Sequence, residues 1–429
     1  MTRILPPAPR AHVVVLHRWR DSYALYDGYI DHDRNSVTYV VTARSRSSVP
    51  TGAAVVVAVD DITDLGAVRT SLAEPVRRLG RPAAVIALQE GDLPVASRLR
   101  EEYGCPGRRW ADLHRFLDKQ AMLDAAAATG VAVPTYCRVD SVTEIEDFAR
   151  VFGWPLVVKP LQGRASAGVR RLEGPPDLPD SEATFAAPIL VQRHVPFPVY
   201  HADGYFDGRA LGPWRLARYV NVPASVTHGP LAFNDGEPVG EVEVDDARLR
   251  AAVKKFLGIL VPGMSPEPWV FHCELFIDEN AETPECVFLE VGCRPGGGEI
   301  PFVWRDVYGI DLMELEFALQ CGLVPEPPRE SAITPVGGSL LVPLVGPRPA
   351  RITEVTSMLG RPDGPYAECV PALGSVVAAV TGTYEYVGGR FRFSGPSTAD
   401  VTRKITATAR DYVVRSLPVR GRSPQQQGA

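Results

Sequence analysis

The sequence contains few lysines, no paired cysteine motif and no long apolar segment. Only five of its 45 basic residues are lysines, so a lysine at a given position suggests a need for a compact ammonium group. The seven cysteines are scattered without a C-x-x-C pair, which argues against a disulfide framework or a thiolate zinc site. The longest apolar runs are well below the ~20 residues that span a bilayer, and the first residues lack the apolar core of a signal peptide. We therefore expect a cytoplasmic protein that does not enter a membrane.

The chain also lacks an excess of one charge and several familiar catalytic motifs. Its formal net charge is −6, without blocks of like charge, which argues against nucleic-acid binding and favours small molecules as partners. The sequence has no P-loop G-x-x-x-x-G-K-[ST] and no H-E-x-x-H, so neither a Walker-type nucleotide site nor a zinc hydrolase site is indicated. The sequence does not specify the oligomeric state, for which a homodimer is one option.

The patterns that are present predict an α/β and α+β protein of several domains. Short β-branched runs without alternation in the first hundred residues are typical of parallel strands covered on both faces. Residues 111–129 are rich in Ala and Leu and precede Gly130 and Pro134, which predicts a helix with a glycine stop. We expect a Rossmann-like α/β domain at 1–110, a middle domain at 111–325, a small α+β segment at 326–420 and a disordered polar tail at 421–429.

The segment around Lys159 is the most informative. A buried strand at residues 156–159 delivers the lysine, and a loop of Gly, Ala and Ser follows at residues 163–168. Small residues let backbone N–H groups approach phosphate oxygens closely, while the ammonium supplies a compact charge. The segment predicts a phosphate-binding loop. The alternative is a glycine-containing β-hairpin with an incidental lysine.

Two glutamates fall on a predicted hairpin. Glu274 and Glu290 each lie within an apolar run, and a polar turn joins the two runs. A hairpin can place the two carboxylates side by side, where they repel each other unless a cation lies between them. Oxygen ligands of this kind suit Mg²⁺ bound to substrate phosphates. In the alternative, one glutamate is a surface residue and the other pairs with Arg294.

These segments follow one another in an order that resembles the ATP-grasp superfamily, and more closely its carboxylate–amine ligases, which include bacterial L-amino acid ligases. The resemblance spans about residues 13–319. It is carried by Asp118-Lys119, Lys159 with its loop, Val191-Gln192-Arg193-His194-Val195, Asp203-Gly204, and Glu274 and Glu290 with Arg294. It implies an ATP-grasp fold at 111–325, preceded by the family's pre-ATP-grasp domain. A lid subdomain would lie at about 135–195 and a catalytic subdomain at about 196–325.

The resemblance implies an ATP site. Two lysines would contact the phosphates, the small-residue loop would close over them, and a hinge segment would read the adenine edge. The implied residues are Lys119, Lys159, Gly163, Ser166, Gly168, Gln192, Arg193 and Val195. Val199 stands where many members carry a ribose-binding Glu, so the ribose contact must come from elsewhere or be absent.

The resemblance also implies the metal and catalytic residues. Glu274 and Glu290 would bind Mg²⁺, with Mn²⁺ as an alternative, and Arg294 would steady the acyl phosphate or the substrate carboxylate. Gly292 stands where many members carry a further Asn ligand, so the number of Mg²⁺ ions is left open. His272 is expected to be a packed core residue and not a metal ligand.

The implied activity is that of an ATP-dependent carboxylate–amine ligase with small-molecule substrates, which we expect to be amino acids. A carboxylate would take the γ-phosphate of ATP to give an acyl phosphate and ADP, and an amine would then displace phosphate. The expected substrate contacts are Arg218, His228, Gly297, Glu299 and Arg305.

Two other functions stay open. A biotin carboxylase-like enzyme would use bicarbonate, although the chain has no Met-Lys-Met biotinylation site. A non-catalytic nucleotide-binding module is the second, and the presence of both lysines and both glutamates argues against it.

Overall fold

The chain divides into two compact units. The computed structural model describes residues 11–20, 22–163, 168–178, 184–221, 236–326, 335–378 and 387–419. Unit 1 consists of Met1–Leu216, Asp246–Gly297 and Gly309–Ser331, and unit 2 of Ala217–Asp245, Gly298–Tyr308 and Ala332–Ala429. The tail expected to be disordered, 421–429, lies outside the described residues.

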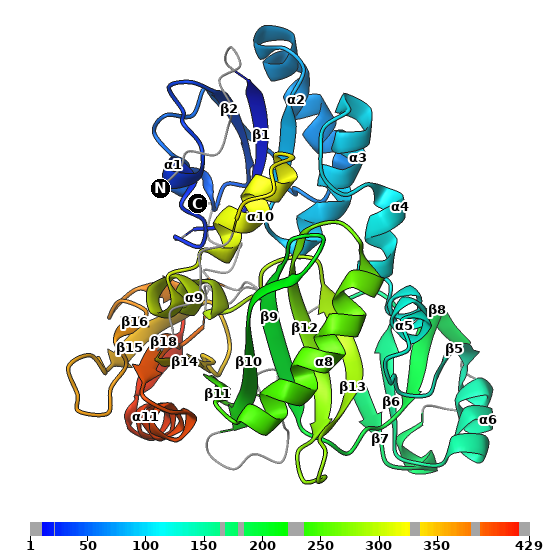
Figure 1. The fold of residues 1–429 in the computed structure, drawn as a ribbon. Helices are drawn as coiled ribbons and strands as arrows, with labels where there is room; N and C mark the ends of the chain where they lie inside the picture. The colour runs from blue at the N-terminus through cyan, green and yellow to red at the C-terminus, as the bar shows by residue number, and fades with distance from the viewer. Residues whose placement is uncertain are drawn as a thin grey trace, which may run out of the picture. The chain divides into compact units, whose positions relative to one another are not determined.

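A four-stranded parallel sheet begins unit 1 (Figure 1). Its strand order is β3 (Val55–Ala58), β2 (Ser36–Val41), β1 (His12–His17) and β4 (Ala84–Ala87). All residues of β1 and β4 are buried, as continuous apolar runs predict for parallel strands. The helices of this part are α1 (Tyr26–Tyr29), α2 (Leu65–Leu79), α3 (Leu93–Tyr103) and α4 (Trp110–Leu113), with 3-10 turns at Arg46–Ser48, Glu90–Asp92 and His114–Phe116.

The helix expected at 111–129 is interrupted. After α4 and a 3-10 turn, α5 runs over Lys119–Ala128. The break occurs because Asp118 caps α5: its backbone is extended, and its carboxylate accepts two backbone N–H groups of the first turn. Gly130 follows the helix with a φ of 90°, so the predicted glycine stop is confirmed.

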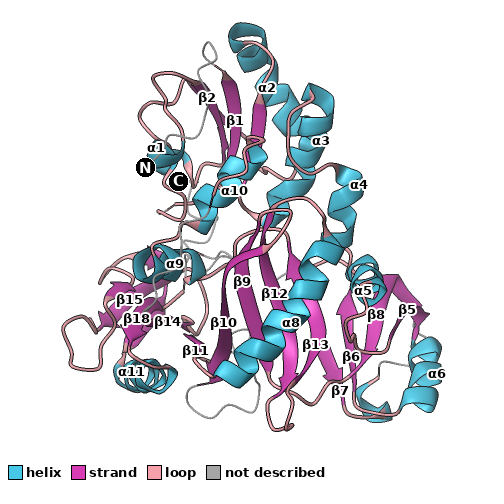
Figure 2. Ribbon diagram, in the orientation of Figure 1, coloured by secondary structure: helices cyan, strands magenta, loops and turns pink. Residues whose placement is uncertain are grey.

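A small antiparallel sheet carries the segment around Lys159. Its order is β5 (Tyr136–Ser141), β8 (Thr184–Arg193), β6 (Leu156–Pro160) and β7 (Arg170–Leu172), with a 3-10 turn at Pro175–Asp177. Helix α6 (Val142–Phe152) flanks the sheet (Figure 2) and buries Ile145 and Phe148 in the same cluster as Leu156 and Val191. This spacing of apolar residues along the helix is typical of one buried face.

A larger antiparallel sheet completes unit 1. It pairs β13 (Glu285–Gly292), β12 (Trp269–Asp278) and β9 (Val199–Phe206) in this order, and β10 (Leu211–Asn221) begins in the same unit. Helices α8 (Ala247–Met264) and α10 (Leu312–Gln320) belong to this part. Gly204 on β9 is required by space, because a Cβ there would lie 2.7 Å from both the Phe271 ring and the Trp214 Cβ.

Unit 2 has a core of its own. Antiparallel strands β11 (Val239–Glu243), β14 (Val336–Val342), β18 (Gly389–Gly395) and β16 (Ala367–Cys369) follow the end of β10 in strand order. A second sheet is ordered β17 (Val376–Val377), β15 (Ala350–Val355) and β19 (Val414–Pro418). The helices among its described residues are α9 (Ile300–Tyr308) and α11 (Thr398–Asp411). Leu340, Phe391 and Ile405 are among its fully buried residues.

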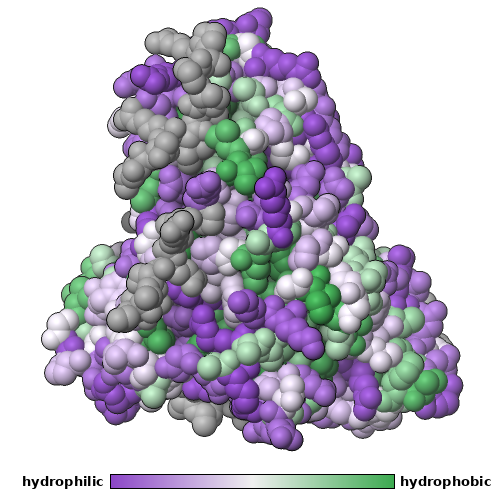
Figure 3. All heavy atoms as spheres, viewed as in Figure 1, coloured by the Kyte–Doolittle hydropathy of each residue, from purple (hydrophilic) through white to green (hydrophobic). Residues whose placement is uncertain are grey.

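The combination of a parallel sheet, antiparallel sheets and helices confirms the predicted fold class. Within the described ranges, no helix combines the length and apolar character needed to cross a membrane. Hydrophilic side chains are spread over much of the face shown in Figure 3.

Candidate active site

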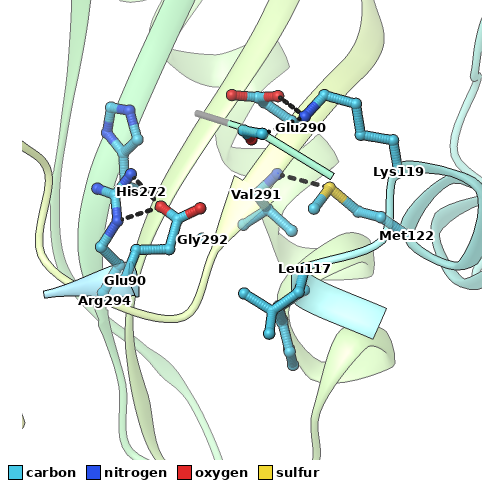
Figure 4. A pocket seen from close by; sticks show the side chains of 11 residues that line it. Glu90, Leu117, Lys119, Met122, His272, Glu290, Val291, Gly292 and Arg294 are labelled. Atoms are coloured by element: carbon cyan, nitrogen blue, oxygen red, sulfur yellow. Dashed lines mark hydrogen bonds and ion pairs between the residues drawn. The ribbon is translucent and has the colours of Figure 1, made fainter. Parts of the chain in front are cut away.

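A pocket in unit 1 gathers charged side chains from distant parts of the sequence (Figure 4). They come from the turn after β4, the start of α5, strands β12 and β13, and the segment that follows β13. Its titratable lining residues are Glu90, Lys119, His272, Glu290 and Arg294. Charges of both signs around one pocket suit a ligand that carries several charges of its own.

Lys119 reaches this pocket from the first turn of α5. Its Nζ donates to the carbonyl oxygen of Gly163 at 3.0 Å and lies 3.9 Å from a carboxylate oxygen of Glu290. The backbone N–H of Lys119 also donates to the carbonyl of Leu161 at 2.8 Å. The start of α5 is therefore tied directly to the loop that follows β6.

Lys159 lies on β6 and is only 4% exposed. Burial lowers the pKa of its ammonium to about 8; Lys119 also lowers it, while Glu290 and Glu274 act in the opposite direction. A desolvated ammonium gains the most from an added anion, since the Coulomb attraction is strong where water is excluded. The position thus suits a phosphate group.

Glu274 and Glu290 lie directly opposite each other in the β12–β13 ladder, with a register shift immediately after Glu274. Residues opposite each other in an antiparallel pair direct their side chains to the same face, with Cβ atoms about 5 Å apart. Glu274 is 8% exposed, whereas the Glu290 side chain is 40% exposed. The pair therefore offers oxygen ligands to a divalent cation that enters from the Glu290 side.

Arg294, just beyond β13, pairs with Glu90 and not with either strand glutamate. Its Nε donates to Glu90 Oε2 at 2.6 Å, and its Nη2 lies 2.6 Å from the same oxygen. Burial alone raises the pKa of Glu90, but the Arg294 guanidinium holds that pKa below its ordinary value. The sequence-based alternative paired Arg294 with one of the two strand glutamates, whereas the ion pair that Arg294 forms among the described residues is with Glu90.

Asp203 connects two histidines behind the pocket. It accepts from Nδ1 of His201 at 2.7 Å and from Nδ1 of His272 at 2.9 Å. Burial opposes ionisation of Asp203, yet His272 and then His201 lower its pKa far below the ordinary value. His272 therefore lines the pocket as an oriented ring and is not the packed core residue expected from the sequence.

The same three side chains bring potential ligand atoms within 4.8 Å of one another, a spacing that a metal ion could use. The hydrogen bonds between the two imidazoles and Asp203 account for this spacing without a metal.

The expected adenine hinge covers the end of β8 and the two residues after it. Gln192 is 2% exposed, and among the described residues its Oε1 meets no hydrogen-bond donor. The backbone N–H of Arg193 donates to Thr135 and that of His194 to Pro155, while Val195 is half-buried. A buried amide oxygen without a donor favours a ligand that supplies one, as the exocyclic amine of adenine would.

The small-residue loop is only partly described. Gly163 lines the pocket. Gly168 has a φ of 74°, and a Cβ there would lie 2.9 Å from the Pro160 ring, so glycine is required on two grounds. Ser166 lies outside the described residues.

Comparisons with known proteins address the fold. No protein-family model matches the chain. The L-arginine-specific L-amino acid ligase of Bacillus subtilis is 22% identical over 271 residues, which cover 60% of this chain and 62% of that relative. The L-amino acid ligase from Bacillus licheniformis superposes with a TM-score of 0.69 at 16% identity, covering 96% of this chain and 99% of the other. The chain has the ATP-grasp fold.

A second solved structure with this ATP-grasp likeness is the biotin carboxylase–β,γ-ATP complex from Campylobacter jejuni. Its TM-score is 0.66 at 13% identity, with coverage of 94% and 92%. The resemblance inferred from Lys119, Lys159 and the glutamate pair is thereby confirmed at the level of the fold.

Of the expected substrate contacts that the structure describes, none lines this pocket, and their role stays a prediction. Arg218, Glu299 and Arg305 belong to unit 2, and Gly297 to unit 1 without lining the pocket. Glu299 is fully buried, with Arg390 at 3.2 Å and Arg392 at 2.6 Å, which is the environment of a structural ion pair. His228 lies outside the described residues.

The sequence analysis missed Glu90 as a residue of this pocket. Glu90 lies in the 3-10 turn that follows β4. Residues that follow parallel strands gather at the carboxyl edge of the sheet, where ligands bind in α/β folds. The sequence feature that could have identified Glu90 is its position as an acidic residue shortly after the last buried strand of the N-terminal domain. The partner, Arg294, lies 204 positions away, so no local pattern connects the two.

Proposed function

We propose that the chain is an ATP-dependent ligase that joins a carboxylate to an amine through an acyl phosphate, with amino acids as substrates. One observation carries the proposal: a single pocket holds Lys119, Glu290 and Arg294. Glu290 also raises the pKa of the buried Lys159 against the effect of burial. Phosphoryl transfer needs positioning and charge neutralisation more than a nucleophilic side chain. These residue types supply both.

In the first step, a carboxylate oxygen attacks the γ-phosphorus of ATP, the bond to the bridging oxygen breaks, and ADP leaves. Lys119 and Lys159 hold the phosphates, and Arg294 faces the acyl phosphate as it forms. Glu274 and Glu290 would hold Mg²⁺, which would neutralise phosphate charge; Mn²⁺ is an alternative. In the second step, the amine attacks the acyl carbon, loses a proton and displaces phosphate, which leaves an amide.

Release of ADP in the presence of amino acids tests this function. The twenty amino acids would be supplied singly and in pairs with ATP and Mg²⁺, and ADP and phosphate would be measured together with the condensed product. We expect ADP release with a restricted set of pairs. No turnover with any carboxylate would instead support a nucleotide-binding module.

A biotin carboxylase-like activity is the second candidate, favoured by the structural likeness to the Campylobacter jejuni protein. It makes a different prediction, because turnover would then depend on bicarbonate and biotin. ADP release that needs both, and no amino acid, would favour this candidate.

A further inference from the structure

The outer edge of β3 is a feature that the ligase chemistry does not use. β3 is the end strand of the parallel sheet, and among the described residues no other strand pairs with its outer side. Val55, Val56 and Val57 are only half-buried, whereas all residues of β1 are buried. Strands of a parallel sheet are ordinarily covered on both faces, so β3 leaves apolar side chains and backbone groups accessible.

Apart from its short length, β3 carries none of the usual features that prevent an edge strand from pairing with another chain. The run 53–59 contains no charged residue and no proline, and its register with β2 continues from Val55 to Ala58 without a bulge. Natural edge strands commonly carry a lysine, a proline or a bulge that blocks further pairing. An apolar edge without these features favours a protein strand as its partner.

The alternation of the strand fixes which backbone groups of β3 are available. The N–H of Ala54 donates to the carbonyl oxygen of Val37 in β2 at 2.9 Å. Successive residues of a strand direct their backbone N–H and C=O groups to opposite sides. Ala54 and Val56 therefore face β2, whereas Val55 and Val57 direct their backbone groups outward.

We propose that two copies of the chain associate through β3, with the two β3 strands antiparallel and a two-fold axis beside Val56. In this register Val55 of one copy lies opposite Val57 of the second copy, and each such pair exchanges two backbone hydrogen bonds. The contact is isologous, because both copies contribute the same strand. The two parallel sheets become one continuous sheet.

The charges at the two ends of β3 support a second copy as the partner. At the beginning of the strand, the exposed Arg78 of α2 donates to the carbonyl oxygen of Ala54 at 3.3 Å. Beyond the end of the strand lies the exposed Asp61. An antiparallel pair brings the beginning of one β3 beside the end of the other, so Arg78 of each copy approaches Asp61 of the second copy. Opposite charges thus meet at both ends of the interface.

Cysteine cross-linking tests the register in the full-length protein. Val56→Cys would place two thiols at the two-fold axis, where the Cα atoms of a pair that is not hydrogen-bonded lie about 4.5 Å apart, a distance that a disulfide bridges. Val55→Cys is the matched control on the same strand, because the two copies of residue 55 lie diagonally, about 7–8 Å apart. Both variants would be treated with a mild oxidant beside wild type, which has cysteines of its own, and analysed by non-reducing electrophoresis.

We expect several-fold more covalent dimer in Val56→Cys than in wild type, and the wild-type level in Val55→Cys. A disulfide needs its two Cα atoms within about 7 Å, so the diagonal pair should not be bridged. Equal cross-linking of the two variants, or none above the wild-type level, would overturn the proposed register.

The mass in solution tests the association itself, without an oxidant. Sedimentation would be measured over a range of concentrations for wild type, whose monomer mass is 46.6 kDa, and for Val57→Pro. Proline removes the outward N–H of Val57 but none of the hydrogen bonds to β2, and proline is tolerated on the outer side of an edge strand.

We expect wild type to approach twice the monomer mass in the micromolar range, as is typical of a small interface. Val57→Pro should stay monomeric with an unchanged circular dichroism spectrum. If Val57→Pro does not fold, the cross-linking of Val56→Cys decides. Wild type that stays monomeric at every concentration, or a folded Val57→Pro that dimerises as wild type does, would overturn the proposal.

Discussion

Asp203 on β9 lies directly opposite His272 on β12, and its carboxylate accepts the Nδ1–H of that imidazole at 2.9 Å. The same carboxylate accepts from His201 at 2.7 Å. Because Asp203 is an acceptor only, each imidazole directs its other ring nitrogen, Nε2, away from it. The orientation of His272 at the pocket wall is therefore set by a residue from a neighbouring strand.

Replacement of Asp203 should destabilise the protein. An Asp203→Asn side chain has the same shape but directs an N–H₂ group toward one of two buried N–H donors, which costs about 1–3 kcal/mol. We expect a lower urea midpoint than for wild type at pH 7, and no change for Asp60→Asn at an exposed position.

The difference in stability between wild type and Asp203→Asn should depend on pH. The pKa of Asp203 in the folded state is well below its ordinary value of 3.8, because the two histidines outweigh burial. A carboxyl group with a lowered pKa in the folded state stabilises the fold at any pH above its pKa in the unfolded chain. This contribution is lost as the pH falls toward the pKa of the folded state. The gap between wild type and Asp203→Asn should therefore be full above about pH 5 and shrink below about pH 4. A gap that widens in acid would contradict the hydrogen-bonded arrangement.

Replacement of Lys159 should abolish turnover. Loss of a buried charge-assisted contact to phosphate costs a few kcal/mol, and each ~1.4 kcal/mol is a factor of ten in rate. Lys159→Arg should also fail, because a forked guanidinium does not replace a compact ammonium. ADP release measures both variants, with exposed Lys255→Arg on α8 as the control. Wild-type activity in Lys159→Arg would show that the phosphate assignment is wrong.

The same lysine should cost stability in the absence of nucleotide. Burial lowers its pKa to about 8, so at pH 7 the charged ammonium destabilises the folded state. This destabilisation disappears as the pH rises toward the pKa of the lysine in the unfolded chain. We expect Lys159→Met to have an equal or higher Tm than wild type at pH 7, measured without ATP. A drop of several degrees would indicate a structural role instead.

Glu290→Gln should raise the Mg²⁺ concentration needed for half-maximal activity, because a neutral amide is a poorer ligand for a hard cation than a carboxylate. We expect a shift of about tenfold or more, the cost of one weakened charged contact. Glu285→Gln, exposed on the same strand, is the matched control and should leave the titration unchanged. An unchanged titration in Glu290→Gln would remove it from the metal site.

Arg294→Ala should retain binding of ATP and Mg²⁺ but lose the hydroxamate trapped from the acyl phosphate. The guanidinium contacts Glu90 and the chain itself, so some loss of stability is expected, in addition to the loss of activity. If hydroxamate formation continued at the wild-type rate while the Tm fell by several degrees, Arg294 would be a structural partner of Glu90 only.

The sequence by itself determined the elements and their order. Continuous apolar runs predicted the parallel strands, glycine ended α5 at Gly130, and the hairpin of β12 and β13 followed from two apolar runs with a polar turn between them. These features are local, because strand patterns, helix stops and turns depend on residues within about one element of each other. The Lys159 strand and the pairing of Glu274 with Glu290 were predictable for the same reason.

Only the tertiary structure decided which distant side chains meet. Glu90 contacts Arg294 across 204 positions, and His272 is oriented by Asp203 across 69. Glu299 and Arg305, expected as substrate contacts, belong to the second compact unit, so their role stays a prediction. These contacts depend on how sheets and helices pack against one another, and that packing is driven by the burial of whole apolar faces. A single charged side chain adds nothing to the periodic pattern by which such faces are recognised in a sequence.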